Sequence, residues 1–112
     1  MATEWSNEIV ICDLADEPEL SDELNDLYNR LREAANEGCP SVVLNLTSVT
    51  YVNSSNIAQF LRVRRTLMEN GKEMRMCAVP DPVWSIFLLT GLDKVFVFAP
   101  DKATAIASLQ ID

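Results

Sequence analysis

Two kinds of hydrophobic periodicity alternate along this chain, and the alternation constrains the fold more than any other feature. Short apolar runs rich in β-branched residues predict strands, at 8–12, 42–46, 74–79 and 95–98. Stretches with apolar residues at steps of three and four predict helices between and after them, at 20–31, 57–68, 82–90 and 102–109. The clearest helical stripe is formed by Leu20, Leu24, Leu27 and Leu31.

The three glycines each follow a predicted helix and precede an apolar run. Gly38, Gly71 and Gly91 are therefore expected to end helices with a positive φ. No glycine then remains for a loop that cradles phosphate groups, and neither common glycine-rich nucleotide-binding pattern occurs.

Several helix starts are also marked by residue type. Asp81 is expected to cap the third helix with Pro82 at its first position, and Asp101 to cap the last. For the first helix two starts remain open: Pro18 in the first turn after Asp16 or Glu17, or Ser21 as the cap.

Helix-length connections between successive strands predict an α/β fold with a largely parallel sheet. We expect a mostly parallel sheet of four to five strands and about four helices, the fifth strand being an option near Glu4–Asn7. Functional residues in such sheets usually lie in loops beyond the carboxyl ends of the strands. Those loops are Thr47–Asn53, Pro80–Asp81 and Ala99–Asp101.

Missing residue types exclude several chemistries. The chain has no His, so His-activated nucleophiles and His metal ligands are excluded. Cys12, Cys39 and Cys77 form no closely spaced pair, so we expect reduced thiols that behave as small apolar side chains. No nucleophile–base pair or carboxylate dyad emerges. We therefore expect no enzyme activity, no metal, no cofactor and no tightly bound mononucleotide.

The charge distribution disfavours nucleic acid as a partner. The formal net charge is -8, and residues 1–37 carry 11 of the 17 acidic but only 2 of the 9 basic side chains. Such an acidic half repels a phosphate backbone. The cluster Arg62, Arg64 and Arg65 spreads over more than one helical face. No apolar run reaches the roughly 20 residues of a membrane span, and no secretory signal is evident. We expect no membrane insertion and a cytoplasmic location.

Residues 45–56 leave a predicted buried strand and enter a helix, with hydroxyl and amide side chains but no acid or base. Free N–H groups at a helix start favour an anion, including a phosphate attached to Ser54. A simpler interpretation is that Asn53 or Ser54 only caps the helix. On residue chemistry alone the simpler interpretation is the stronger one.

This segment resembles the characteristic segment of STAS domains, the family named for sulfate transporters and anti-sigma factor antagonists. The family pattern is Asp-Leu-Ser-x-Val-x-aromatic-aliphatic-Asp-Ser-Ser/Thr-Gly. The chain matches it at Leu46, Thr47, Val49, Tyr51, Val52, Ser54 and Ser55. The Asn70-Gly71-Lys72 turn, Thr90-Gly91-Leu92 and the closing helix are also similar to that family. The resemblance covers nearly the whole chain and implies a single STAS-like domain over residues 1–112.

The resemblance implies a protein-binding switch. A stand-alone family member of this length typically sequesters an anti-sigma factor that is also a serine kinase, and so frees the sigma factor. The kinase phosphorylates a serine that corresponds to Ser54, with Ser55 as the alternative acceptor, and a phosphatase resets the switch. The residues expected to bind the partner are Tyr51, Asn53, Ser54, Ser55 and Asn56.

Three departures from the family pattern support an alternative. Asn45 and Asn53 stand where the family usually has Asp, and Asn56 stands where it usually has Gly. Loss of both carboxylates favours a constitutive, non-phosphorylated interaction subunit, as in lipid-transport ABC complexes or stress-signalling assemblies of the family. The retained Ser54-Ser55 pair favours the switched antagonist.

Overall fold

A computed structural model of the chain describes residues 2–5, 8–34 and 38–110. They include a five-stranded sheet of order β1-β2-β3-β4-β5. Its strands are β1 (Ala2–Trp5), β2 (Ile9–Asp13), β3 (Ser41–Asn45), β4 (Met74–Cys77) and β5 (Phe98–Ala99). The helices are α1 (Glu19–Ala34), α2 (Ser54–Glu69), α3 (Asp81–Thr90), the 3-10 turn η1 (Leu92–Lys94) and α4 (Lys102–Gln110).

The sheet is parallel except at one edge. Strands β2 to β5 pair in parallel, with Val10 opposite Val42 and Leu44 opposite Met76. Strand β1 runs antiparallel to β2. The α/β prediction of a mostly parallel, four- to five-stranded sheet with about four helices is therefore confirmed.

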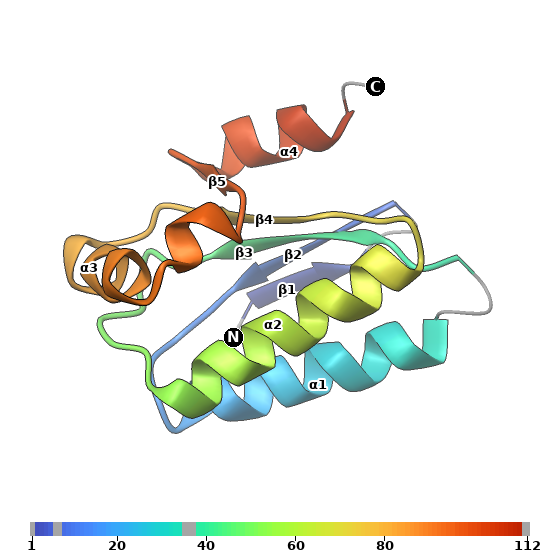
Figure 1. Cartoon of the computed structure of the whole chain (residues 1–112). Coiled ribbons are helices and arrows are strands. Elements are labelled where there is room, and N and C mark those ends of the chain that lie inside the picture. The colour runs from blue at the N-terminus through green and yellow to red at the C-terminus, as the bar shows by residue number, and fades with distance from the viewer. Residues whose placement is uncertain (1, 6–7, 35–37, 111–112) are drawn as a thin grey trace.

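Helices cover the two faces of the sheet unequally. Figure 1 shows α1 and α2 side by side below the sheet, α3 at one end, and α4 alone above it. The larger core lies between the sheet and helices α1, α2 and α3. It contains all four leucines of the predicted α1 stripe together with Phe60 and Phe87. On the other face Ala105 of α4 packs near Val43 and Cys77.

Two glycines end helices as predicted. Gly71 and Gly91 have φ of 69° and 75°. Gly91 directly follows α3, and Gly71 follows α2 after the cap residue Asn70. Gly38 also has a positive φ, but residues 35–37 between it and α1 lie outside the described residues. The cap prediction for Asp101 is confirmed, since its carboxylate accepts the backbone N–H of Thr104 at 2.7 Å.

The predicted last strand, 95–98, is wrong. The backbone N–H groups of Val95 and Phe96 both donate to the carbonyl of Leu92, which keeps this stretch in a turn. Only at Val97 does the chain reach β4, where its carbonyl accepts the N–H of Met76 at 2.9 Å. The last strand is therefore limited to β5, Phe98–Ala99, and Val95 and Phe96 pack against the core without pairing with a strand.

Other boundaries shift by a few residues. The optional strand at Glu4–Asn7 is instead β1, and residues 6–7 lie outside the described part. Helix α3 is capped by Pro80 rather than by Asp81, because the Pro80 carbonyl accepts the first helical hydrogen bonds and Pro82 has no N–H to donate.

The start of α1 agrees with the alternative in which the first turn follows Glu17, and Ser21 as the cap is wrong. Pro18 precedes the helix, and Ser21 lies inside it. The Glu17 carboxylate accepts the backbone N–H of Ser21 at 2.7 Å and its hydroxyl at 2.5 Å. A glutamate side chain thus satisfies the first turn of α1.

All three cysteines are free and buried, as expected. Burial raises the pKa of the Cys39 and Cys77 thiols above the ordinary value. Both groups therefore stay protonated at neutral pH, which suits a packing role rather than a reactive one.

Candidate functional site

The candidate site lies where β2, β3 and β4 end, at the edge where α2 begins. The chain leaves β3 at Asn45, crosses the loop 46–53 and enters α2 at Ser54. The loop that joins β2 to α1 lies at the same edge of the sheet (Figure 1). Parallel strands therefore bring residues 13–17 and 45–56 together, although they are far apart in sequence.

Asn53 and Asn56 form a reciprocal cap at the start of α2. The Asn53 side-chain oxygen accepts the backbone N–H of Asn56 at 2.9 Å, and the Asn56 side-chain oxygen accepts the backbone N–H of Asn53 at 3.0 Å. This is a capping box built from two asparagines. The expectation that Asn53 caps the helix is confirmed, and two of the three departures from the family pattern satisfy each other.

The Asn56 side chain points inward and has 0% exposure. Its amide nitrogen lies 3.4 Å from both the Glu17 carboxylate and the Gln59 side-chain oxygen. Gln59 in turn donates to the Ser21 carbonyl of α1 at 3.0 Å. The start of α2 is therefore fastened to the start of α1 through buried amides.

A second link joins the two loops directly. The Asp16 carboxylate accepts the backbone N–H of Thr50 and the Thr50 hydroxyl, each at 2.7 Å. The hydrogen bonds from Thr50 hold the pKa of Asp16 below its usual value. The bonds from Ser21 do the same to the pKa of Glu17. Both groups are carboxylates at neutral pH, so the site has acids that segment 45–56 itself lacks.

Asn45, the third departure, also faces a carboxylate. Its amide nitrogen donates to Asp13 at the end of β2 at 2.8 Å, and its oxygen accepts the Thr47 hydroxyl at 2.6 Å. Lys102 of α4 lies 3.2 Å from the same Asp13 carboxylate. The hydrogen bond from Asn45, followed by the contribution of Lys102, lowers the pKa of Asp13. An amide at position 45 can donate to Asp13, whereas the usual aspartate would repel it.

The expected partner-binding residues separate into exposed and buried groups. Tyr51 is 63% exposed, and Ser54 and Ser55 are exposed in the first turn of α2. Asn53 is half-buried, and Asn56 is turned away from the surface. Within the described residues neither serine hydroxyl makes a side-chain hydrogen bond. Both hydroxyls are therefore open to a partner, whereas Asn56 supports the loop from below.

The site residues expected from the sequence did not include Asp13, Asp16, Glu17 or Gln59. Asp13, Asp16 and Glu17 end or follow the first predicted strand, so the parallel topology itself places them at this edge. Gln59 gives no such signal, because a glutamine within a helix normally points to solvent. Within the described residues no group of three or more His, Cys, Asp or Glu side chains could hold a metal ion.

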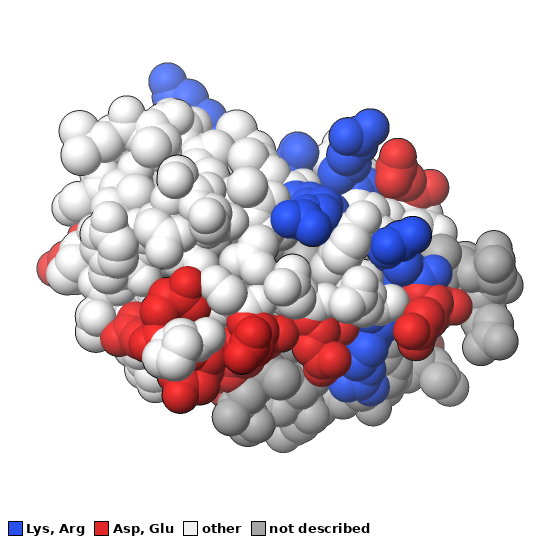
Figure 2. Space-filling model, turned by 90° about the horizontal axis from the view of Figure 1, so that it is seen from below, with Lys and Arg blue, Asp and Glu red and all other residues white. Residues whose placement is uncertain are grey.

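Charge is unevenly spread over the face formed by α1 and α2. Figure 2 shows the acidic side chains as a band across that face, with most of the basic ones outside the band and one group within it. The first half of α2, from Ser54 to Leu61, carries no charged side chain, whereas its second half carries Arg62, Arg64 and Arg65. The serines therefore lie on an uncharged stretch of helix beside the Asp16–Glu17 loop.

Comparisons with known proteins agree on one family. The family model described as "Mlab, STAS domain" matches residues 19–99. The "Anti-sigma F factor antagonist" of Paenibacillus polymyxa is 26% identical over 73 residues, which cover 65% of this chain and 62% of that protein. The "Anti-sigma-B factor antagonist" of Staphylococcus aureus is 29% identical over 70 residues, 62% of each chain. The matches thus span about three-fifths of these relatives' length.

Solved structures share the fold at low identity. An anti-sigma-factor antagonist (STAS) domain protein from Planctomyces limnophilus superposes with a TM-score of 0.82 at 15% identity, covering 98% of this chain and 97% of that one. The antagonist SpoIIAA in its unphosphorylated form gives 0.71 at 15% identity, covering 97% and 96%. Phosphorylated SpoIIAA of Bacillus gives 0.69 at 17%, covering 96% of each. In the described residues no helix is long and apolar enough to cross a membrane.

Proposed function

The chain belongs to the STAS domain family, and we propose that it is an anti-sigma factor antagonist switched by phosphorylation of Ser54. In this proposal the unphosphorylated protein holds an anti-sigma factor and so frees a sigma factor. The anti-sigma factor is also the serine kinase that modifies Ser54, and a phosphatase restores the binding form. The names of the two curated relatives support the general role.

The observation that carries the proposal is the position of Ser54. Its side chain is exposed at the first residue of a 16-residue helix, directly after the Asn53 cap. The helix start carries roughly half a positive charge. A phosphate of about -1.5 to -2 charge can therefore be accommodated there without unfolding α2.

Phosphorylation would change the surface more than the fold. The turn is held by the Asn53–Asn56 cap and the Asp16–Thr50 link, and neither uses the Ser54 hydroxyl. The added charge would sit on an uncharged stretch of α2, beside the carboxylates of the β2–α1 loop. A partner docked on the uncharged surface would meet a dianion, and binding would weaken.

The second candidate is a constitutive interaction subunit of the same fold. The observation that favours it is the amide cap itself. Position 53 offers no carboxylate beside the serine, and the Asn53 oxygen is already engaged by the Asn56 N–H. In this case Ser54 is never phosphorylated, and the same edge binds its partner permanently.

Intact-mass analysis of the protein isolated from its own cells separates the two candidates. The switched antagonist carries one added phosphate, which fragmentation assigns to Ser54 and which Ser54→Ala removes, whereas Ser55→Ala retains it. Phosphate on Ser55, or on neither serine under all growth conditions, refutes the proposed switch at Ser54.

Binding completes the test. Each serine-kinase anti-sigma factor encoded in the same genome is titrated calorimetrically with the wild type, Ser54→Ala and Ser54→Asp. We expect Ser54→Ala to bind as the wild type does and Ser54→Asp to bind more weakly while melting at an unchanged temperature. Absence of binding by the unphosphorylated wild type to every such protein refutes the antagonist function.

A further inference from the structure

A groove lies between the second half of α2 and the segment Val95–Val97 that precedes β5. It encloses a cavity of about 200 Å³. Buried Met74 and Phe96 line it, together with Met68 and Val97, which are 57% and 51% exposed. Its lining is therefore largely apolar but open to solvent.

The groove exists because the last predicted strand does not form. The turn at η1 holds the backbone of Val95 and Phe96, so β5 begins only at Phe98 and leaves the Val97 side chain uncovered. On α2, Leu61 and Met68 are seven residues apart and so lie on one face. Both are exposed, and Arg64 and Arg65 lie between them on the same side of the helix, so the apolar surface at the cavity is Met68 bordered by cations.

The charged residues around the groove leave two cations uncompensated. Arg64 and Lys72 line the cavity. Of the two acids that could neutralise them, Glu69 pairs with Arg65 at 3.8 Å. The other, Glu73, pairs with Arg75 at 3.2 Å. Within the described residues neither Arg64 nor Lys72 forms an ion pair.

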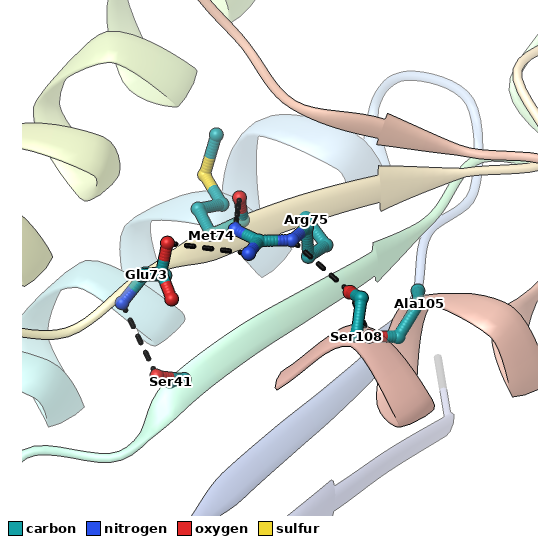
Figure 3. Close-up of polar contacts among 6 residues, drawn as sticks. All are labelled: Ser41, Glu73, Met74, Arg75, Ala105 and Ser108. Carbon is teal, nitrogen blue, oxygen red and sulfur yellow. Dashed lines mark hydrogen bonds and ion pairs between the residues drawn. The ribbon is translucent and has the colours of Figure 1, made fainter. Parts of the chain in front are cut away.

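Arg75 and Glu73 also line the cavity, but they pair with each other and so add no net charge to it. Its guanidinium donates to the Ser108 hydroxyl of α4 at 3.1 Å and to the Met74 carbonyl at 3.3 Å. Figure 3 shows this side chain directed toward α4 and toward Glu73, which itself donates its N–H to Ser41. Arg75 therefore connects α4 to the sheet and is paired within the groove, which leaves Arg64 and Lys72 as its unpaired cations among the described residues.

The size of the cavity indicates a side chain rather than a free ligand. Small-molecule pockets usually occupy about 300–1,000 Å³, and this one is smaller. We propose that the groove binds a segment of a partner protein that places one or two large apolar side chains in the cavity and carboxylates against Arg64 and Lys72. Although the chain has a net charge of -8, the two cations at this groove would attract an acidic segment.

The groove is separate from the Ser54 edge. Met68 follows Ser54 by 14 residues of one helix, so about 21 Å of helix axis separates the two. A partner held in the groove therefore does not require an unmodified Ser54. The proposal goes beyond the switch and holds or fails without it.

Amide chemical shifts of ¹⁵N-labelled protein, recorded during titration with short synthetic peptides, test the proposal. The probe is acetyl-Asp-Glu-Leu-Phe-Glu-Asp-amide. One matched peptide replaces every acid by its amide, and a second replaces Leu-Phe by Gly-Ala. We expect the probe to shift residues 61–72 and 95–97, in the wild type and in Ser54→Asp alike, and each matched peptide to bind at least about fivefold more weakly.

Variants locate the contacts. Arg64→Glu combined with Lys72→Glu should weaken probe binding about tenfold or more, because repulsion replaces attraction. Arg62→Glu is the control, because Arg62 lies over the Tyr28 ring, 5.0 Å from its centroid, and does not line the cavity. It should change probe binding less than about threefold.

Several results would overturn the proposal. The proposal fails if millimolar probe shifts no residue of the groove or if the amide peptide binds equally well. It also fails if the Arg62→Glu control loses as much binding as the double variant. Binding of phosphatidylglycerol vesicles through the groove, with no binding of the probe, would show a lipid surface as the ligand and also overturn it.

Discussion

The two ends of α2 use the same helix in opposite ways. At the Ser54 end an exposed, uncharged first turn rests on buried polar side chains, above all Asn56 and Gln59, which connect it to α1. At the other end exposed Met68 and Val97 border an apolar cavity, with cations at its edge. The surface around Ser54 is held in shape by hydrogen bonds beneath it, whereas the groove is bordered by solvent-exposed apolar side chains.

This difference separates stability from binding. Asn56 and Gln59, which support the Ser54 edge, are buried, so changing them leaves polar groups without partners and lowers the free energy of unfolding. Residues that border the groove are exposed, so changing them should affect association and hardly affect folding. Substitutions chosen from the two regions can test whether this separation is real.

The largest effect is expected from Asn56→Ala. The change removes half of the capping box and leaves the Asn53 N–H and the Gln59 oxygen without their partner. Loss of a cap and of buried hydrogen bonds should lower the free energy of unfolding by about 2–3 kcal/mol. Urea unfolding measures it, with Ser55→Ala as the exposed control within about 0.5 kcal/mol. A cost for Asn56→Ala no larger than that of the control would show that the buried network does not support the edge.

A smaller effect is expected from Asn45→Asp, which restores the usual family residue. It places a carboxylate oxygen where the amide now donates to Asp13 at 2.8 Å. Lys102 offsets part of the repulsion, so we expect a loss of about 1 kcal/mol at neutral pH. The loss should disappear as the pH falls and one carboxyl of the pair takes up a proton. The double variant Asp13→Asn with Asn45→Asp should recover stability, and equal losses in single and double variants would contradict the explanation.

Most of the fold could be predicted because it depends on periodicity and on turn residues. The leucine stripe of α1, the parallel order and the positive φ of Gly71 and Gly91 follow from local pattern. The failure at 95–98 has a tertiary cause. An apolar run has the same appearance whether it pairs with a strand or packs through a turn, and here the Leu92 carbonyl takes the N–H groups that a strand would need.

The candidate site was predicted only in part, for a related reason. The exposed serines and the Asn53 cap follow from the sequence of one loop. The Asp16–Thr50 link and the contact between Asn45 and Asp13 join residues more than 30 positions apart. Such pairs become visible only when the register of parallel strands is known. For the same reason the sequence alone shows the three asparagines only as losses of charge, whereas in the fold each of them has hydrogen-bond partners.

A third prediction concerns pH and the link between the two loops. Hydrogen bonds from Thr50 lower the pKa of Asp16 from its ordinary value of 3.8. The carboxylate therefore stabilises the fold above that pH, and the contribution is lost as the pH falls through and below it. Asp13, Glu17 and Asp101 act in the same direction. Unfolding free energy measured between about pH 6 and pH 3 should fall for the wild type and fall less steeply for Asp16→Asn. Asp26→Asn, on the exposed side of α1, is the control. If the free energy of unfolding falls with pH as steeply in Asp16→Asn as in this control, Asp16 does not contribute to the pH dependence.

The smallest effect is expected from Met68→Gln in the groove, and it tests the other half of the comparison. Met68 is more than half exposed, and glutamine has a similar length and a good helix propensity. The free energy of unfolding should therefore change by no more than about 0.5 kcal/mol. The same exchange at Met76, which is fully buried in β4, should cost several times more, because an amide would lie without partners in the core.

Urea unfolding of both variants measures the free energy of unfolding, and titration with the acidic probe peptide measures binding. If Met68→Gln weakens probe binding while the stability of the variant stays at the wild-type level, the groove acts as a binding surface that folding does not require. If Met68→Gln is as destabilising as the change at Met76, the side chain belongs to the core and the contrast between the two ends of α2 fails.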